Sequence, residues 1–309
     1  MSDIFFQLAD KLSKQMDMGQ VYSVCLNSMK PDEQGYSGAK LVRLNCTFSN
    51  GKTVSFICKY TGMSERIVMK TLTEQKREHT PYSYSNLNET KEMAWFIMQD
   101  IQPCEKVPYG SLAWKKQVAG ALADIHADNF ICTTEMSRLP YADEAYWKHI
   151  TTQISVDHFE RQCAKNNAFA AKYAVMLPKI HRCAETFVQN MTEMYRERSS
   201  LTVTHGDLQN IYGNHVRCFH GKPMIIDWGF SRYAPFYIDL MDYFTQEDAM
   251  LYWGELHRHG FVISKNDFKE RFRIVSCYPA FIYMYPALAQ YNRGDSTRLD
   301  SLLTLLCRD

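Results

Sequence analysis

The stretch "LTVTHGDLQNIYGNHV", residues 201–216, decides the expected fold class of this chain. Its apolar residues alternate with threonines, as in a strand, and then run into His-Gly-Asp, which ends at Asp207. A second apolar run, "PMIID", ends at Asp227. A strand that runs into a loop exposes its last side chain, and neighbouring strands bring two such ends together. The sequence therefore predicts that these two carboxylates converge.

Two converging carboxylates with an asparagine between them predict a magnesium site. Mg²⁺ prefers hard oxygen ligands and completes its coordination with waters and phosphates. An aspartate beside a metal-bound phosphate can also accept the proton of a hydroxyl nucleophile. Together these parts suit phosphoryl transfer, in which the protein mainly positions groups and neutralises charge.

The pattern "HGDLQNIYGN…MIIDWG" resembles the catalytic segment of the aminoglycoside phosphotransferase and choline kinase group. These are small-molecule kinases with a protein-kinase-like fold. The resemblance implies that Asp207 is the catalytic base and that Asp227 binds the metal. It also implies that His205 braces the loop and that Asp239, in "YIDLMDY", is structural.

The asparagine of this pattern is displaced. The family places it five residues after the catalytic aspartate, where this chain has Tyr212. Asn210 comes two residues early and Asn214 two residues late, and both are predicted metal ligands. Asn214 is preferred, because a loop absorbs an insertion more easily than a deletion across a metal site. The hairpin that follows contains Val216, a further predicted nucleotide contact.

The front of the chain supplies a lysine for the phosphates. The runs "GAKLVRLNCTF" and "KTVSFICKY" flank an Asn-Gly pair, which is a strong hairpin signal. Lys59 ends the second run, where the resemblance implies an ammonium group against the α- and β-phosphates. A glutamate on the next helix should hold it. Glu78 is the predicted partner and Glu74 its rival, since helical spacing puts both on one face.

Two further segments resemble nucleotide-binding parts of the family. "GYSG" resembles a glycine-containing phosphate loop, with Gly35, Ser37 and Gly38 as predicted contacts. "WFIMQDI" resembles the hinge between lobes, whose backbone at Gln99 to Ile101 would bind the base of ATP or GTP.

The distribution of these patterns predicts an α+β chain of two lobes. The first hundred residues are strand-rich, "QPCEKVPYGS" interrupts the pattern, and long helical periodicities follow. We therefore expect a small antiparallel nucleotide-binding lobe over residues 1–101. A larger, mostly helical lobe with the catalytic loop and substrate pocket should occupy residues 102–309.

The composition of the chain limits the kinds of partner that it is expected to bind. The chain is 46% hydrophobic and 22% charged, as in globular proteins, and its net charge of +1 favours neither nucleic acid nor membrane. No apolar stretch approaches the length of a transmembrane helix. The ten cysteines form no Cys-x-x-Cys pair, which favours core residues in a reducing cytosol over zinc ligands. We expect a cytoplasmic protein.

The predicted activity is ATP- or GTP-dependent phosphorylation of a hydroxyl on a small molecule. Aminoglycosides, choline-like amino alcohols, sugars and related compounds all remain possible acceptors. A kinase acting on protein side chains is disfavoured, because no activation-like segment follows Asp227. A nucleotide-binding protein without catalysis is the other alternative, favoured by the displaced asparagine. Five aromatic residues could surround a quaternary ammonium by cation–π contact: Tyr243, Tyr252, Trp253, Tyr283 and Tyr285.

Overall fold

A computed structural model describes two compact units built from interleaved segments of the chain. The residues described are 2–27, 29, 39–76, 78–87, 91–130, 136–208 and 215–306. The first unit comprises Met1–Ile125, Cys132–Pro140 and His205–Ser231, and the second comprises His126–Ile131, Tyr141–Thr204 and Arg232–Asp309. The segment with Asp207 and Asp227 thus packs with the N-terminal sheet, although the sequence put it in the C-terminal lobe. The division into functional lobes at residues 101 and 102 stays a prediction.

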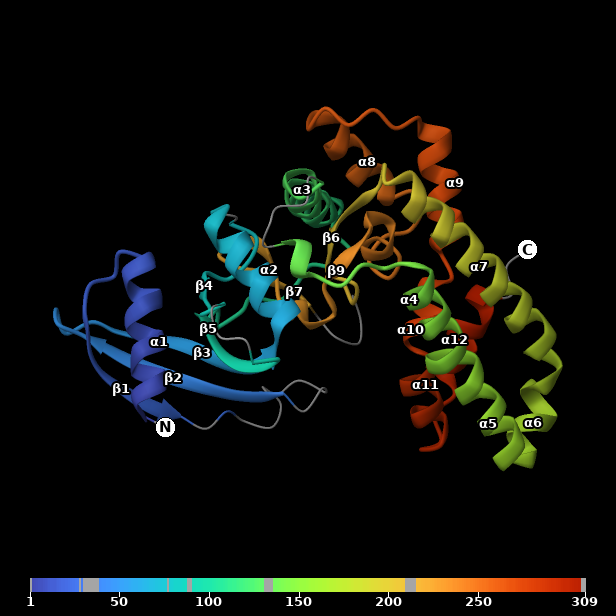
Figure 1. The fold of residues 1–309 in the computed structure, drawn as a ribbon, viewed down its shortest axis with the longest axis horizontal. Helices are drawn as coiled ribbons and strands as arrows, with labels where there is room; N and C mark the ends of the chain where they lie inside the picture. The colour runs from blue at the N-terminus through green and yellow to red at the C-terminus, as the bar shows by residue number, and fades with distance from the viewer. Residues whose placement is uncertain are drawn as a thin grey trace. The chain divides into compact units, whose positions relative to one another are not determined.

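The first unit contains a five-stranded antiparallel sheet (Figure 1). The hairpin predicted around the Asn-Gly pair is confirmed, with Lys40 opposite Tyr60 and Thr47 opposite Thr53. Gly51 has a φ of 82°, the left-handed conformation that this turn needs. The strand order is β1-β2-β3-β5-β4, formed by β1 (Val21–Asn27), β2 (Lys40–Phe48), β3 (Thr53–Gly62), β4 (Ser83–Tyr84) and β5 (Met93–Gln99).

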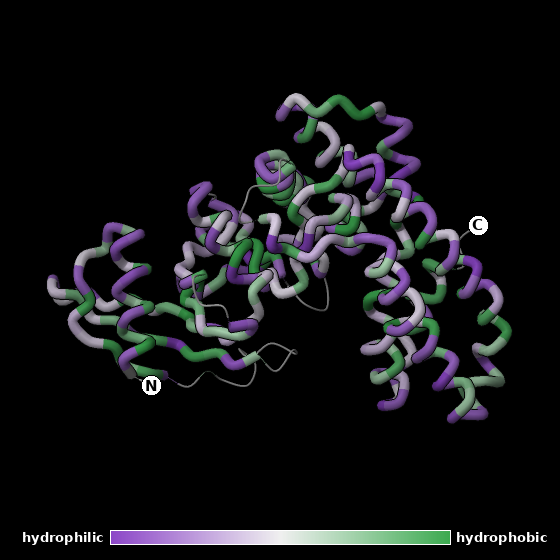
Figure 2. Tube along the Cα trace, viewed as in Figure 1, coloured by the Kyte–Doolittle hydropathy of each residue, from purple (hydrophilic) through white to green (hydrophobic). Residues whose placement is uncertain are grey.

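Helix α1 (Ser2–Gln15) packs its apolar stripe against this sheet. Phe5, Leu8, Ala9 and Leu12 recur at helical spacing and are all buried. Figure 2 shows the alternation of hydrophilic and hydrophobic residues along the helix. The same core cluster takes in residues of the sheet: Val21, Leu44, Cys46, Phe48, Phe56, Cys58 and Ile97.

Helix α2 (Met63–Glu74) follows β3 directly, with Gly62 as its N-cap. A second hairpin in this unit joins β7 (Val216–Phe219) and β8 (Lys222–Ile225). The Ile225 N–H donates to the carbonyl of His79 at 2.7 Å, so the hairpin is attached to the segment after α2. The unit also contains most of α3 (Leu112–Asp128), η2 (Met136–Arg138) and η5 (Trp228–Phe230).

The second unit is mainly helical, with one short antiparallel pair of strands. Helix α7 starts at Leu177 with Pro178 in its first turn, a position that proline tolerates. None of the helices in the described part of the chain is long and apolar enough to cross a membrane. The elements are α4 (Glu144–Lys148), the π-helix η3 (His149–Val156), α5 (Asp157–Lys165), α6 (Asn167–Tyr173), η4 (Ala174–Met176), α7 (Leu177–Glu197), β6 (Leu201–Thr204), β9 (Arg232–Pro235), η6 (Phe236–Asp239), α8 (Ala249–Arg258), α9 (Lys265–Val275), α10 (Tyr278–Ile282), α11 (Met284–Tyr291) and α12 (Thr297–Leu306).

Candidate functional site

Lys59 lies at the centre of a buried cluster of charges in the first unit. Its Nζ is 2.8 Å from Oε1 of Glu65 and 2.5 Å from Oδ1 of Asp227. The Lys59 residue is 7% exposed and Glu65 is 2% exposed. The other oxygen of Glu65 accepts a hydrogen bond from the Thr61 hydroxyl at 2.6 Å. One cation is thus held between two acids that come from α2 and from the end of β8.

The predicted glutamate partner of Lys59 is wrong. Glu78 pairs with Lys222 at the surface, and Glu74 pairs with Lys70 at 2.9 Å. The chain enters α2 straight from β3, so the first helical turn lies beside Lys59. Glu74 follows Glu65 by nine residues, about 13 Å further along the helix axis. The sequence feature that identifies the true partner is Glu65, an acid in the first turn of the helix that follows the strand of Lys59.

Burial and charge act against each other in this cluster. Burial alone would lower the pKa of Lys59, but the carboxylates of Glu65 and Asp227 outweigh it and raise that pKa. Burial raises the pKa of Glu65 by more than the attraction to Lys59 lowers it. Burial also acts to raise the pKa of Asp227, but the ammonium of Lys59, which attracts and hydrogen-bonds this carboxylate, lowers it overall. At neutral pH the cluster therefore contains an ammonium group facing an ionised Asp227.

Two histidines connect the Asp207 segment to the Asp227 segment. The Nε2–H of His205 donates to the carbonyl of Ile226 at 2.8 Å, and its Nδ1 accepts from the Asp207 N–H at 3.2 Å. The Nδ1–H of His215 donates to the carbonyl of Asp207, and its Nε2 lies 3.7 Å from Oδ2 of Asp227. The two rings lie 5.3 Å apart, centre to centre. The two acid-bearing segments therefore lie side by side, and the convergence of the two carboxylates stays a prediction. His215 was not among the predicted site residues.

The backbone at the site is tightly constrained. Gly206 has a φ of 76°, and a Cβ there would lie 2.9 Å from the carbonyl oxygen of Phe230. Glycine alone adopts such a conformation freely and leaves room for this approach. Asp227 is also left-handed, with φ 66° and ψ 58°, a conformation that aspartate tolerates better than most residues. The His-Gly-Asp loop is thereby packed onto the turn that follows Asp227.

The remaining predicted nucleotide contacts are only partly described. Gln99 ends β5, and its N–H already donates to the carbonyl of Tyr82 at 2.8 Å. Ile101 and Val216 are both buried, and Val216 pairs with Ile225 in the second hairpin. Five other predicted site residues lie outside the described part of the chain: Gly35, Ser37, Gly38, Asn210 and Asn214.

The described residues fit a metal bound together with nucleotide phosphates. Within them, no group of three or more His, Cys, Asp or Glu side chains could hold a metal ion. Mg²⁺ in nucleotide sites needs only one or two protein carboxylates, because phosphates and waters fill the other positions. The Asp227 carboxylate is ionised and 37% exposed, so it can supply such a ligand.

The expected aromatic cage is wrong for three of its five members. Tyr243, Tyr252 and Tyr283 are buried in the second unit. The Tyr252 hydroxyl lies 2.7 Å from Nδ1 of His126, whose Nε2 lies 3.1 Å from Oδ2 of Asp239. Because all members of this triad are fully buried, they form a structural network, which agrees with the expected structural part of Asp239.

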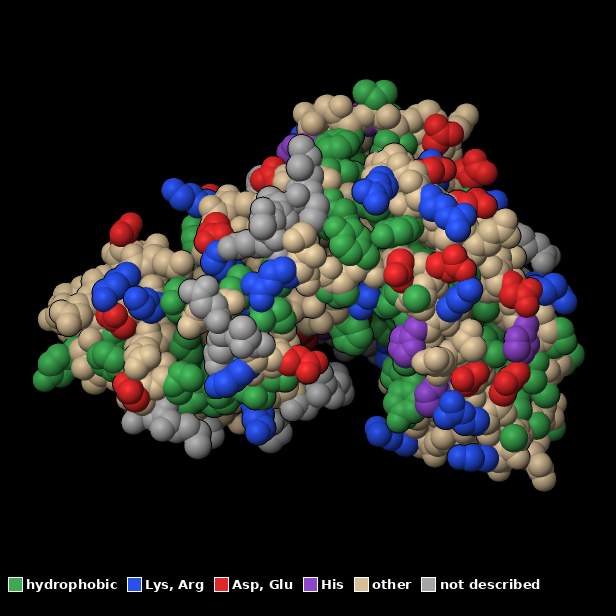
Figure 3. Space-filling view, in the orientation of Figure 1, with side chains coloured by type: hydrophobic (Ala, Val, Ile, Leu, Met, Phe, Trp, Pro, Cys, Tyr) green, Lys and Arg blue, Asp and Glu red, His purple; other side chains and the backbone are tan. Residues whose placement is uncertain are grey.

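Two hollows lie within the second unit. A groove of about 870 Å³ runs along α4, η3, α5 and α7, where Figure 3 shows acidic, basic and histidine side chains together. Its charged lining comprises Glu144, Lys148, Asp157, Glu160, Glu185, Glu193 and Arg196.

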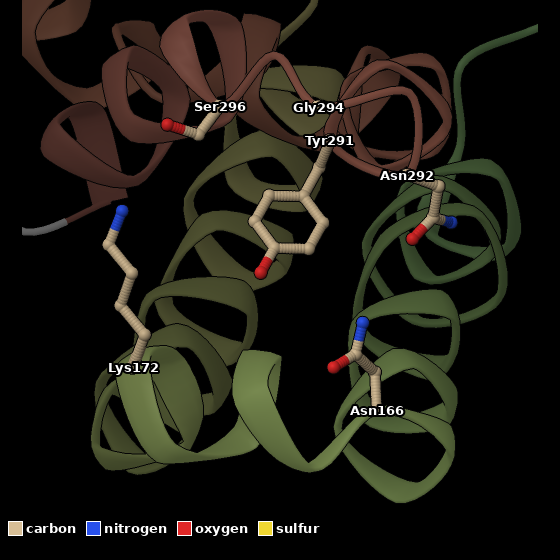
Figure 4. A pocket seen from close by; sticks show the side chains of 6 residues that line it. All are labelled: Asn166, Lys172, Tyr291, Asn292, Gly294 and Ser296. Atoms are coloured by element: carbon tan, nitrogen blue, oxygen red, sulfur yellow. The ribbon is translucent and has the colours of Figure 1, made fainter.

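A smaller hollow of about 440 Å³ lies between α6 and the α11–α12 connection. Figure 4 shows Lys172 and Tyr291 extending into it from opposite sides. The segment "EAYWKHI" lines the groove, and Tyr291 at the end of "PAFIYMYPALAQY" lines this smaller hollow.

Comparison with solved structures shows a shared fold. A choline kinase from Cryptosporidium parvum Iowa II superposes with a TM-score of 0.65 at 14% identity, over 99% of this chain and 94% of that one. A spectinomycin phosphotransferase in complex with ADP and spectinomycin gives 0.56 at 14% identity, over 97% and 93%. A Plasmodium vivax ethanolamine kinase gives 0.53 at 9% identity, over 92% and 80%. No family model matches the sequence, and the search of curated proteins finds no match either.

The fold is the two-lobed, protein-kinase-like fold of small-molecule kinases, as the sequence resemblance predicted. Its five-stranded sheet and its helical unit match the fold of the choline kinase, the spectinomycin phosphotransferase and the ethanolamine kinase named above.

Proposed function

We propose that this protein is an ATP- or GTP-dependent phosphotransferase that transfers the γ-phosphate to a hydroxyl of a small molecule. The observation that carries the proposal is the buried Lys59 ammonium, held by Glu65 and in contact with Asp227. A cation beside a carboxylate that can bind metal is the arrangement that a triphosphate requires. The structural similarity to kinases of small molecules supports the same reaction.

Each described residue has a defined part in this proposal. Lys59 neutralises charge on the α- and β-phosphates, and Glu65 keeps its ammonium in place. Asp207 orients the acceptor hydroxyl and takes its proton late in the transfer. His205 holds the Asp207 backbone beside Ile226, the residue before Asp227.

Asp227 would hold Mg²⁺, with Asn214 or Asn210 as the predicted amide ligand. A metal held there with the triphosphate would supply charge neutralisation. The proposed base contacts are the backbone groups from Gln99 to Ile101, with Val216 as the apolar contact. Gly35, Ser37 and Gly38 are the proposed phosphate loop.

The proposed acceptor carries a hydroxyl: an aminoglycoside, a choline-like amino alcohol, a sugar or a related compound. Five carboxylates and two strong bases, Lys148 and Arg196, line the groove of the second unit. Glu144 is paired with both of these bases and Glu160 with His181, so the charge of the lining does not choose between these acceptors.

A phosphate-transfer screen tests the proposal. Wild-type protein and the Asp207→Asn variant are incubated with labelled ATP or GTP and a panel of hydroxylated cations, antibiotics and sugars. We expect labelled product from the wild type and at least about a 100-fold lower rate from the variant. Equal turnover by both proteins would show that Asp207 is not the catalytic base.

Nucleotide binding without catalysis is the second candidate, because the asparagine five residues after Asp207 is replaced by Tyr212. It predicts tight binding of Mg-ATP and no ADP release with any member of the panel.

A further inference from the structure

His215 is held in a fixed position next to Asp227. Its carbonyl accepts a hydrogen bond from the Ile226 N–H at 2.9 Å, so the backbone alone places it opposite the residue before Asp227. The residue is 8% exposed, and it directly precedes β7. It directly follows Asn214, the asparagine that the sequence pattern favours as a metal ligand.

The tautomer of His215 follows from its first contact. A carbonyl can only accept a hydrogen bond, so the ring nitrogen that meets the Asp207 carbonyl, Nδ1, must carry a hydrogen. In the neutral ring the other nitrogen, Nε2, then presents a lone pair. Histidines that bind metals typically donate their second N–H to a backbone carbonyl in this way.

The lone pair of His215 faces the oxygen of Asp227 that Lys59 does not contact. Lys59 contacts Oδ1, whereas Oδ2 lies 3.7 Å from Nε2. This separation is too long for a hydrogen bond. Two ligand atoms that are each about 2.1 Å from one metal ion lie about 3 Å apart at a right angle and about 4.2 Å apart when opposite. The observed distance falls between these limits.

We propose that His215 binds the metal–nucleotide complex through Nε2, beside Oδ2 of Asp227; this inference rests on the proposed function. The site then has one nitrogen and one oxygen ligand from the described residues, and phosphates supply the others. Imidazole nitrogen favours transition-metal ions over Mg²⁺. The protein should therefore bind Mn²⁺ with ADP more tightly than Mg²⁺ with ADP, by a margin that depends on His215.

Pulsed electron paramagnetic resonance of Mn²⁺ tests this directly on the full chain with ADP. Coupling to ³¹P reports a metal bound to the nucleotide, and coupling to ring nitrogen reports a bound imidazole. We expect both couplings in the wild type, with the nitrogen signal changing when the protein is made with ¹⁵N-labelled histidine. No variant is needed for this result.

Two variants identify the histidine. His215→Asn should lose the nitrogen coupling, keep the phosphorus coupling and lower the Mn²⁺ affinity on the order of 10-fold. His220→Asn is the matched control, because His220 is exposed at the tip of the same hairpin and has a left-handed backbone that asparagine tolerates. It should keep both couplings.

The outcomes separate the two proposals. Phosphorus coupling without nitrogen coupling in the wild type would show that His215 does not bind the metal. It is the result expected if His215 only pairs with Asp227 as an imidazolium, and it would leave the phosphotransferase proposal intact. Nitrogen coupling that persists in His215→Asn would also overturn metal binding by His215. Absence of any bound Mn²⁺–ADP would overturn the proposed function itself.

Discussion

Replacing Lys59 by methionine should destabilise the protein more than the loss of a typical ion pair. The Lys59 side chain is 9% exposed and that of Glu65 is 2% exposed, so the change leaves a buried carboxylate without its cation. Removing one partner of a buried pair costs about 3–5 kcal/mol. With a urea dependence of about 2 kcal/mol per molar for a unit of this size, the midpoint should fall by about 1.5–2.5 M.

The pH dependence of this loss has a definite sign. The pKa of Glu65 is raised in the folded protein above its ordinary value of 4.5, and loss of Lys59 would raise it further. An acid whose pKa is higher in the folded than in the unfolded protein destabilises the fold when it ionises. This destabilisation is absent at pH values below the pKa of the unfolded protein, and it grows as the pH rises towards the pKa of the folded protein. The difference between wild type and Lys59→Met should therefore shrink as pH falls from 7 towards 4.5.

Urea denaturation at several pH values, followed by fluorescence, measures both effects. Adding Glu65→Gln to Lys59→Met should restore much of the stability, because the uncompensated charge is removed. Lys222→Met, which breaks an exposed pair in the same unit, should leave the midpoint close to that of the wild type. A pH-independent loss, or a double variant no more stable than Lys59→Met alone, would refute the electrostatic explanation.

Three further predictions concern the catalytic loop and the buried network. Asp207→Asn should lower turnover at least about 100-fold while calorimetry finds unchanged affinity for Mg-ATP; a parallel loss of affinity would contradict its part as base. Gly206→Ala should destabilise the protein by about 1–3 kcal/mol in thermal denaturation, because alanine would occupy a left-handed conformation and meet the Phe230 carbonyl; a neutral change would contradict the described loop. Tyr252→Phe should cost about 1–3 kcal/mol, because it leaves Nδ1 of buried His126 without its partner, and an unchanged melting temperature would count against that network.

The sequence predicted those parts of the site that depend on the order of strands, turns and helices along the chain. Lys59 lies near the end of the second strand of a hairpin marked by Asn-Gly, and Asp227 follows the second strand of another hairpin, so alternation and turn residues sufficed to predict these two strands. The two-lobed fold followed from the same order, since a strand-rich front precedes long helical periodicities.

The parts that the sequence did not predict depend on three-dimensional contacts. Glu65, Glu74 and Glu78 are all acids on or just after one helix, and only the direct passage from β3 into α2 selects Glu65. From the sequence, Tyr252 could equally have lined an aromatic cage or a buried core. Its contact with His126, 126 residues away in the chain, shows that it belongs to the core. The part of His215 depends on two contacts across a loop, which no periodicity reveals.

The most direct test of the central claim is the affinity for Mg-ATP of wild type and Asp227→Asn, measured by calorimetry with and without the metal. Asparagine keeps the shape and tolerates the left-handed backbone at this position, so only the charge is lost. We expect the wild type to bind ATP more tightly with Mg²⁺ than without it, and the variant to lose this dependence on the metal. Equal, metal-dependent binding by both proteins, or no binding by the wild type, would contradict the proposed binding of the triphosphate by Lys59 and, through the metal, by Asp227.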